Sequence, residues 1–350
     1  MGIFRLTLAF CVVLGHGLNL PIPAATADVA VQTFYIVSGF YMALVLTERY
    51  HSLRSFFGNR VLRLYPAYAV VAIITLAHAL LRWGIGRSSN LPGLLSYETH
   101  FAPLDLPAKA YLLLTNTLLF GQDVAMFLKI SGDGGSFDWT TNFLNSNPRV
   151  ETFLLVPQSW SLSIELGFYL FAPWLVRRST RALLSIFAAT IALRIALASQ
   201  GLNFDPWTYR FFPAELGSFV LGILLYRSMP HRHTSVATQR IALIGAIVST
   251  LLLATLPQIW ITRVVFYGYV AWALPLMFQL TRNNAVDRYL GELSYPVYLV
   301  HLLAISIALY SGWSGARLAV LIIVMVGGSA VLLENVVQRP VDRLRASLVR

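Results

Sequence analysis

Long apolar blocks alternate with short polar segments along most of the 350-residue chain. Each block is about 17–22 residues long, which is the length that a helix needs to cross a hydrocarbon core of about 30 Å. Lipid offers the backbone no hydrogen-bond partners, so each block must satisfy its own N–H and C=O groups as a helix. The blocks lie at 4–20, 29–47, 64–82, 160–176, 180–198, 211–226, 240–256, 259–279, 293–311 and 315–334. The pattern predicts an all-α fold, a polytopic membrane helix bundle of about ten transmembrane helices.

The arginines between the blocks predict the orientation of the bundle, because short loops rich in Lys or Arg stay in the cytoplasm. The basic segments hold Arg49, Arg54, Arg60 and Arg63; Arg177, Arg178 and Arg181; Arg227, Arg232 and Arg240; Arg282 and Arg288; and Arg339, Arg343, Arg345 and Arg350. Both termini are then cytoplasmic, and the segment 83–159 begins and ends outside. A shorter apolar stretch within it, 109–120, is predicted to be re-entrant or to lie on the surface.

The first block has a second interpretation. Arg5 precedes an apolar run and Ala25-Thr26-Ala27 resembles a cleavage site, as in a secretory signal peptide. His16 inside the run and the many later blocks favour an ordinary transmembrane helix. We expect one integral-membrane domain over 1–350, without a soluble domain.

Composition excludes several classes of protein. Apolar residues make up 57% of the chain and charged residues 12%, which excludes a soluble globular enzyme. The net charge of +11 gathers in loops between blocks, so no nucleic-acid partner is predicted. The single Cys11 excludes a disulfide, and no metal site is predicted. The sequence has no Walker loop, dinucleotide-binding glycine motif, HExxH or GxSxG, which argues against the corresponding chemistries.

Arg5 and His16 are the polar residues of interest in the first block. Eleven steps of 100° return to nearly the same helix face, about 16 Å further along the axis. Arg5 alone is typical of a basic anchor at the membrane surface, and His16 alone is compatible with a packing hydrogen bond. An ionisable group inside a span is nevertheless costly, which makes His16 a functional candidate.

A second group begins at Trp160. Ser161, Glu165 and Tyr169 share one face at intervals of four residues, and Ser163 lies between them. A carboxylate inside a span needs a cation or must be neutral, so Glu165 is predicted to face His16. Glu165 as a simple bridge between helices, and Trp160 as an interfacial belt residue, are the structural alternatives.

Three further groups carry polar side chains. Arg60 and Arg63 form a compact basic pair that can hold phosphates, although arginines in an inside loop are usually topology signals. Ser294, Tyr298 and His301 share a face of their span, and Arg210 and Glu215 flank Pro213 as a possible ion pair.

Five strings, taken in order, carry a resemblance to a known family. They are Arg5 with ten residues before His16; Phe34…Val37-Ser38-Gly39-Phe40; Arg60-x-x-Arg63-x-x-Pro66; Trp160-Ser161-Leu162-Ser163-Ile164-Glu165-x-x-Phe168-Tyr169; and Ser294-Tyr295-Pro296-Val297-Tyr298-Leu299-Val300-His301. Together they resemble the acyltransferase-3 family of integral membrane O-acyltransferases. The chain departs from the family in three places. Glu165-Leu166 stands where an acidic pair is usual, and Gln338 stands where an acidic residue often precedes the terminal Pro. No acidic residue precedes Arg5.

The resemblance implies an acyl-CoA donor, most often acetyl-CoA, used at the cytoplasmic face of a bacterial inner membrane. It also implies a hydroxyl acceptor on a glycan or lipid-linked sugar, and a helper outside the membrane would be a separate protein. We expect Arg60 and Arg63 to hold the CoA phosphates and His16 to act as general base or acyl carrier, assisted by Arg5 and Glu165. The predicted substrate-binding residues are Trp160, Ser161, Ser163, Tyr298 and His301.

Two other functions remain open at this point. In a secondary transporter or flippase, His16, Glu165 and Arg194 would form a proton relay, although the broken spans typical of transporters are not evident. A structural or sensory membrane subunit is the third interpretation. Release of CoA that depends on an acceptor would separate the three.

Overall fold

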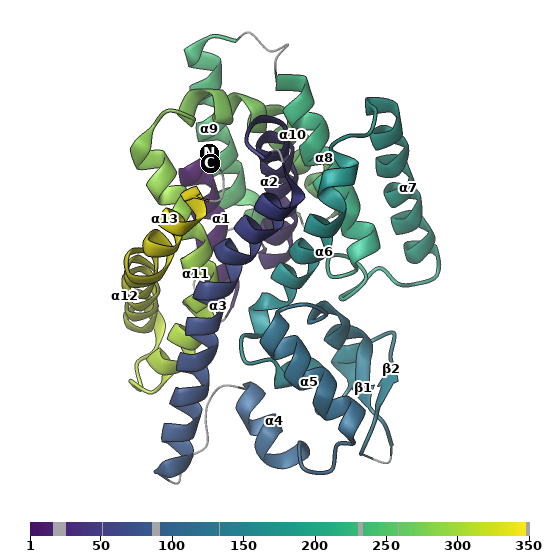
Figure 1. The fold of residues 1–350 in the computed structure, drawn as a ribbon, viewed down its shortest axis with the longest axis vertical. Coiled ribbons are helices and arrows are strands. Elements are labelled where there is room, and N and C mark those ends of the chain that lie inside the picture. The colour runs from purple at the N-terminus through teal and green to yellow at the C-terminus, as the bar shows by residue number, and fades with distance from the viewer. Residues whose placement is uncertain are drawn as a thin grey trace.

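The computed structural model describes residues 1–16, 26–50, 52–85, 92–132, 134–229, 234–257 and 259–347. Helices form most of this part of the chain and pack into an elongated bundle (Figure 1). Each of the ten apolar blocks forms a helix. These helices are α1 Gly2–Gly15, α2 Ala27–Glu48, α3 Leu53–Gly84, α6 Trp160–Leu175, α7 Thr180–Ser199, α8 Phe212–Ser228, α9 Val236–Leu252, α10 Trp260–Thr281, α11 Ala285–Leu309 and α12 Gly315–Leu333.

Seven helices in the described ranges are long and apolar enough to cross a membrane, so the chain is a multi-pass membrane protein. They are α2, α3, α7, α9 with the 3₁₀ turn η6 (Leu253–Thr255), α10, α11 and α12 with its extension. Helices α1, α6 and α8 are shorter, at 14, 16 and 17 residues. The total of ten spans and the cytoplasmic location of both termini therefore stay predictions.

Helix α1 ends earlier than its apolar block. The block predicts a helix over 4–20, whereas α1 ends at Gly15, with His16 as its C-cap residue. Residues 17–20 and Ala25 of the cleavage-like sequence lie outside the described residues. Phe4 and Leu8 of α1 are fully buried in the bundle, which is the environment of an integral helix.

Helix α3 begins earlier than its apolar block, so Arg60 and Arg63 lie in a helix and not in a loop. The hydroxyl of Ser52 accepts a hydrogen bond from the Ser55 N–H at 3.1 Å and caps the first turn. The helix then continues through Pro66. The two arginines are therefore presented in fixed positions on the helix surface.

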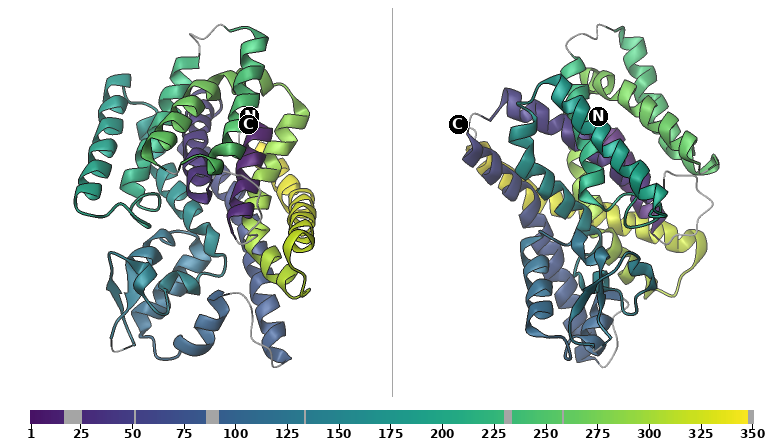
Figure 2. Two further views of the ribbon diagram at one scale, coloured as in Figure 1. Left: turned by 180° about the vertical axis from the view of Figure 1, so that it is seen from behind. Right: turned by 90° about the vertical axis from the view of Figure 1, so that its right-hand side faces the viewer.

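The segment before α6 forms a small lobe at one end of the bundle (Figures 1 and 2). It contains α4 (Pro92–His100), α5 (Leu106–Leu118) and the strands β1 (Leu128–Ile130) and β2 (Phe137–Trp139), which pair antiparallel. Short 3₁₀ turns follow at Asp123–Phe127 (η1), Phe143–Asn145 (η2), Val150–Phe153 (η3) and Pro157–Ser159 (η4). The hairpin corrects the all-α prediction locally, because three-residue strands leave no periodic signal.

Helix α5 covers the ambiguous stretch 109–120. It has 13 residues and packs on the hairpin, with the rings of Tyr111 and Phe137 at 5.9 Å. Leu106, Leu113 and Leu114 on its other side are exposed. This arrangement fits the surface-lying form of the prediction, and a helix of this length is too short to span a hydrocarbon core.

Glycines bring α2 and α8 into close contact at the centre of the bundle. A Cβ atom at Gly39 would lie 2.0 Å from the Phe219 carbonyl oxygen, and one at Gly222 would lie 2.1 Å from that of Ile36. Membrane helices commonly use small residues for such close packing. Ser38, next to Gly39, is thereby held against the neighbouring helices.

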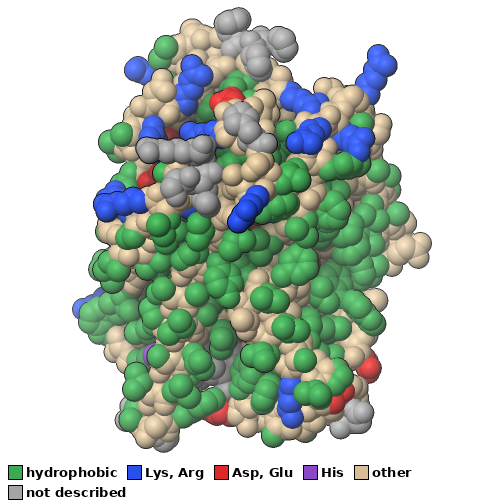
Figure 3. All heavy atoms as spheres, viewed as in Figure 1, with side chains coloured by type: hydrophobic (Ala, Val, Ile, Leu, Met, Phe, Trp, Pro, Cys, Tyr) green, Lys and Arg blue, Asp and Glu red, His purple; other side chains and the backbone are tan. Residues whose placement is uncertain are grey.

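Most basic side chains on the face shown in Figure 3 gather in the upper part of the view, while apolar side chains dominate below. Hydrogen bonds also tie the predicted inside segments together at this end. Tyr226 donates to Glu48 at 2.9 Å, and Arg227 donates to the Val176 carbonyl at 2.8 Å. The structure thus brings together loops that the charge pattern assigns to one side.

Topology reporters test the orientation. Fusions within 121–150 and near Asn203 should read as extracytoplasmic, and fusions near Arg54 and Arg345 as cytoplasmic, because of the Arg bias of the short loops. Two further informative positions, after Leu20 (outside) and near Arg232 (inside), lie beyond the described residues. A cytoplasmic signal from 121–150 would contradict the ten-span arrangement.

Candidate active site

Two imidazoles from opposite ends of the sequence meet beside α1. The ring centroids of His16 and His301 are 5.1 Å apart with an interplanar angle of 60°. His16 is exposed at the end of α1, whereas His301 on α11 is completely buried. The two histidines that the sequence singled out therefore lie next to each other in the fold.

The backbone fixes which nitrogen of each ring carries the proton. Nδ1 of His16 lies 2.8 Å from the Val12 carbonyl oxygen, and Nδ1 of His301 lies 2.6 Å from that of Tyr298. A carbonyl oxygen can only accept, so Nδ1 is the donor in both rings. In the neutral form of each ring Nε2 then carries the lone pair, and Nε2 of His301 is buried without a partner among the described residues.

A hydroxyl chain joins α6 to α11 next to these rings. Tyr298 donates to the Gln158 carbonyl oxygen at 2.8 Å, and the Ser161 hydroxyl lies 2.6 Å from the Tyr298 hydroxyl. The Ser161 hydroxyl also lies 3.4 Å from the Gln158 carbonyl oxygen, so the two hydroxyls and this carbonyl form one hydrogen-bonded group. The chain holds the ring of Tyr298 at 5.7 Å from His301 and fixes the wall of the site.

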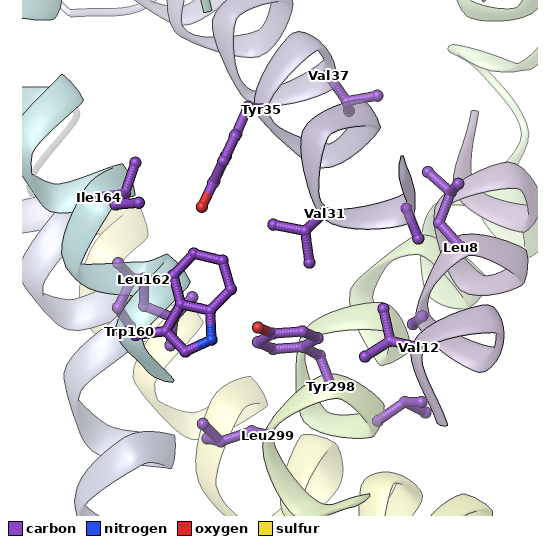
Figure 4. Close-up of a cluster of buried hydrophobic side chains, with 14 of the residues drawn as sticks. Leu8, Val12, Val31, Tyr35, Val37, Trp160, Leu162, Ile164, Tyr298 and Leu299 are labelled. Atoms are coloured by element: carbon purple, nitrogen blue, oxygen red, sulfur yellow. The ribbon is translucent and has the colours of Figure 1, made fainter. Parts of the chain in front are cut away.

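Tyr35, Trp160 and Tyr298 converge from α2, α6 and α11 in the centre of the bundle (Figure 4). The hydroxyl of Tyr35 is buried without a hydrogen-bond partner in the described part of the chain. In the sequence Tyr35 looks like any other residue of its apolar block. Only the tertiary packing directs its side chain toward Trp160. It is a site residue that sequence reasoning missed.

Trp160 is a buried platform and not a residue of the interfacial belt. Its exposed fraction is 6%, the guanidinium of Arg210 lies 4.2 Å from its ring centroid, and the ring of Tyr209 lies at 5.5 Å. Arg210 bonds Asp205 at 2.7 Å. The predicted Arg210–Glu215 ion pair is therefore wrong, because each residue has a different partner.

Glu215 pairs with Arg194 at 2.7 Å and is completely buried. It also accepts from Gln32 at 2.8 Å, which ties α2, α7 and α8 together. Arg194 donates further to the Thr208 and Ala214 carbonyls. These contacts give Arg194 a structural role, and they do not connect it with His16 and Glu165 as the proton-relay alternative requires.

Glu165 lies at a different level from the imidazoles. Its Oε1 accepts from Ser38 at 2.6 Å and from Tyr169 at 2.5 Å. The prediction that Glu165 and Tyr169 share a face is confirmed, but the expected pairing of Glu165 with His16 is not what the structure shows. The depth estimate failed because α1 is short and Glu165 lies in electrostatic range of Arg5, near the opposite end of that helix.

Several arginines lie near Glu165. Arg5 lies over the ring of Tyr41 at 5.7 Å and interacts electrostatically with Glu165 and Arg63. Arg60 is 6% exposed, and its guanidinium lies 5.8 Å from the Tyr169 ring centroid. The predicted pair Arg60 and Arg63 thus belongs to one cluster with Arg5 and Glu165.

A pocket of about 340 Å³ opens beside this cluster. Its lining consists mainly of apolar side chains together with two cluster residues: Phe57, Arg60, Val61, Leu118, Phe120, Leu166, Tyr169 and Leu170. The pocket makes Arg60 and Tyr169 accessible from outside the bundle. It therefore offers space for a ligand at the arginine end of the site.

Ser163 has no free hydrogen-bonding capacity for a substrate. Its hydroxyl accepts from the N–H groups of Gly121 and Gln122 and donates to Asp123 at 2.7 Å. Burial raises the pKa of Asp123, and the hydrogen bond from Ser163 counteracts that effect. Ser163 therefore links α6 to the lobe by hydrogen bonds, and we do not assign it to substrate binding.

A protein-family model described as an acyltransferase domain, of the acyltransferase-3 type, matches residues 1–334. A search of curated proteins and a search of solved structures each gave no match. The matched range contains both imidazoles, Glu165 and the arginines of the site.

Proposed function

This chain belongs to the acyltransferase-3 family, and on that basis we propose that it moves an acyl group, most simply acetyl, from cytoplasmic acyl-CoA to an acceptor hydroxyl across a bacterial inner membrane. The observation that carries the proposal is the pair His16 and His301, in which a backbone carbonyl engages Nδ1 of each ring, so that Nε2 is the basic nitrogen of the neutral imidazole. An accessible unprotonated imidazole is the usual general base for such a transfer.

His16 is the catalytic base in this proposal because it is exposed, whereas His301 is buried. Nε2 of His16 accepts the hydroxyl proton as the acceptor oxygen bonds to the thioester carbonyl carbon. The C–S bond then breaks, and the proton passes from His16 to the departing thiolate. In the covalent variant, Nε2 first bonds to the acyl carbon while the C–S bond breaks and CoA leaves as its thiolate. The acceptor oxygen then bonds to the acyl carbon as the N–C bond breaks, and the hydroxyl proton passes to the CoA thiolate.

The carbonyl of Val12, and not Glu165, fixes the tautomer of His16. Glu165 acts instead at the arginine end, where it balances the charges of Arg5 and Arg63. The arginine cluster and the imidazole pair lie toward opposite ends of α1, about 16 Å apart by helix geometry. An extended pantetheine arm is suited to such a separation, with its phosphates at the arginines and its thioester at His16.

The acceptor in this proposal is a carbohydrate-type molecule, either a glycan or a lipid-linked sugar. The aromatic platform of Trp160 and Tyr209 with Arg210 lies next to the imidazole end and supports this choice. Aromatic faces and charged side chains together suit a ligand that has both apolar ring faces and hydroxyl groups.

The test is incubation of the purified protein with labelled acetyl-CoA and a panel of extracytoplasmic glycans. Release of CoA that depends on an acceptor, together with label on the acceptor, is the expected result. Acceptor-independent movement of a solute across vesicles without CoA release would instead identify a transporter.

The double variant Arg60→Ala/Arg63→Ala should raise KM for acyl-CoA at least about tenfold, with a smaller change in kcat, because phosphate contacts contribute mainly uniform binding. Initial rates at varied donor concentration measure it. Arg54→Ala, an exposed residue in the first turn of the same helix, is the matched control. If KM for acyl-CoA is unchanged in folded protein, the two arginines do not bind CoA and serve only as basic residues that orient the chain in the membrane.

A further inference from the structure

Two guanidinium groups from distant parts of the sequence share one neutral acceptor. Nη2 of Arg60 on α3 donates to Oδ1 of Asn59 at 2.8 Å, and Nη2 of Arg345 donates to the same oxygen at 3.0 Å. Arg345 lies on α13 (Arg339–Ser347), which follows a π-helical turn, η7 (Glu334–Gln338), and packs along α3. Asn59 thus holds two cations side by side without neutralising either.

Both guanidinium groups retain unused donors. The Nε atoms of Arg60 and Arg345 are buried and have no partner in the part of the chain that the structure describes. Buried polar groups in proteins are nearly always hydrogen-bonded, so two unsatisfied N–H groups at one place require an explanation. A ligand that accepts several hydrogen bonds would satisfy them.

The charges around Arg345 also point to an anion. Arg345 is repelled by Arg63 and Arg60 and bonds Asp342. Asp342 is the carboxylate that pairs with this guanidinium, and Oε1 of Glu165 accepts hydrogen bonds from Ser38 and Tyr169.

Another carboxylate near the arginines is Glu334. It is buried in η7 and interacts electrostatically with Arg63 and with Asp342. Arg60 makes no ion pair among the described residues. An unpaired buried charge is costly, so the buried guanidinium of Arg60 favours a bound anion.

Phosphate has the chemistry that this cluster recognises. Guanidinium groups present planar N–H donors that match phosphate oxygens, and such charge-assisted bonds are short and strong. Arg60 also lines the pocket of about 340 Å³, so the cluster is accessible from outside the bundle.

We propose that Arg345 on α13, together with Asn59 and Arg60 on α3, binds the phosphate groups of the CoA donor, so that the C-terminal helix forms one wall of the donor site. This inference rests on the proposed function, because it takes CoA as the donor. Arg345 lies beyond residues 1–334, the range of the family match.

Binding of CoA itself tests the inference, measured by calorimetry on the full-length protein in phosphatidylcholine nanodiscs, where no anionic lipid competes. Arg345→Met should raise the Kd for CoA at least about tenfold. Arg343→Met removes the same charge from an exposed position two residues earlier on α13 and should change Kd less than about twofold. Equal losses in both variants would show a general charge effect and overturn the proposal.

Asn59→Asp keeps the test decisive if Arg345→Met does not fold. A carboxylate at this position would pair with both guanidinium groups, so the variant should be at least as stable to heat as the wild type. It should nevertheless bind CoA at least about tenfold more weakly, because the anion site is then occupied internally. A stabilised Asn59→Asp variant with wild-type affinity would overturn the proposal.

The outcomes also separate this inference from the proposed function. Wild-type protein that binds no CoA would refute the CoA donor itself. If Arg345→Met binds CoA with the same Kd as the wild type, only the role of α13 is refuted. Weaker binding of phosphatidylglycerol by Arg345→Met, with CoA binding unchanged, would assign the cluster to a lipid headgroup and likewise refute the proposal.

Discussion

His16→Ala should lower the turnover number for acyl transfer by at least about 10²–10⁴-fold while the protein stays folded and inserted. In the proposed mechanism Nε2 of His16 is the accessible base, and Nδ1 is committed to the Val12 carbonyl. His301 is completely buried, so it cannot take over without rearrangement. Acceptor-dependent release of CoA from purified protein measures the loss.

His16→Gln separates catalysis from packing. Glutamine can keep a hydrogen bond to the backbone but cannot take up a proton at neutral pH, so this variant should fail as well. His78→Ala, which removes an imidazole from α3 outside the site, is the control and should retain activity. If His16→Gln kept most activity while His16→Ala was unstable, His16 would be a packing residue and the mechanism would have to move to His301.

Arg194→Met should destabilise the protein by about 3–5 kcal/mol, because it leaves the completely buried Glu215 without its cation. Reversible unfolding in mixed micelles measures the free energy of unfolding. Arg181→Met, on an exposed position of the same helix, is the control and should change it by less than about 0.5 kcal/mol.

The double variant Arg194→Met/Glu215→Leu should recover much of this stability, since replacing both members of a buried pair by apolar residues is often neutral. The folded fraction of each variant should also keep the wild-type turnover number, because the pair lies apart from the imidazoles. A tenfold fall in turnover without loss of stability would contradict the structural role and revive the proton relay.

The sequence by itself determined the helices. All ten apolar blocks form helices. A single segment inside lipid can pair its own backbone N–H and C=O groups only as a helix, whichever segments lie next to it. Boundaries were less predictable: α1 ends at Gly15 and α3 begins at Leu53. Hydropathy reports where lipid lies, whereas helix ends are decided by caps such as Ser52.

Local spacing also determined contacts within one helix. Glu165 and Tyr169 share a face at i and i+4 and are hydrogen-bonded, because helical geometry alone brings them together. The same reasoning failed between helices. Depth along two spans does not say which helices are neighbours, so Glu165 was assigned to His16 and lies instead with Ser38 of α2.

Only the tertiary structure decided the chemistry of the site. His16 and His301 meet from the first and eleventh helices, and Arg345 joins Asn59 across 286 positions. Contacts of this range depend on how helix faces select one another, through close glycine packing such as that of Gly39 and through buried pairs such as Arg194 with Glu215. A periodic pattern encodes the length and the apolar face of each helix, but the partner of a polar side chain is fixed only when the whole bundle packs.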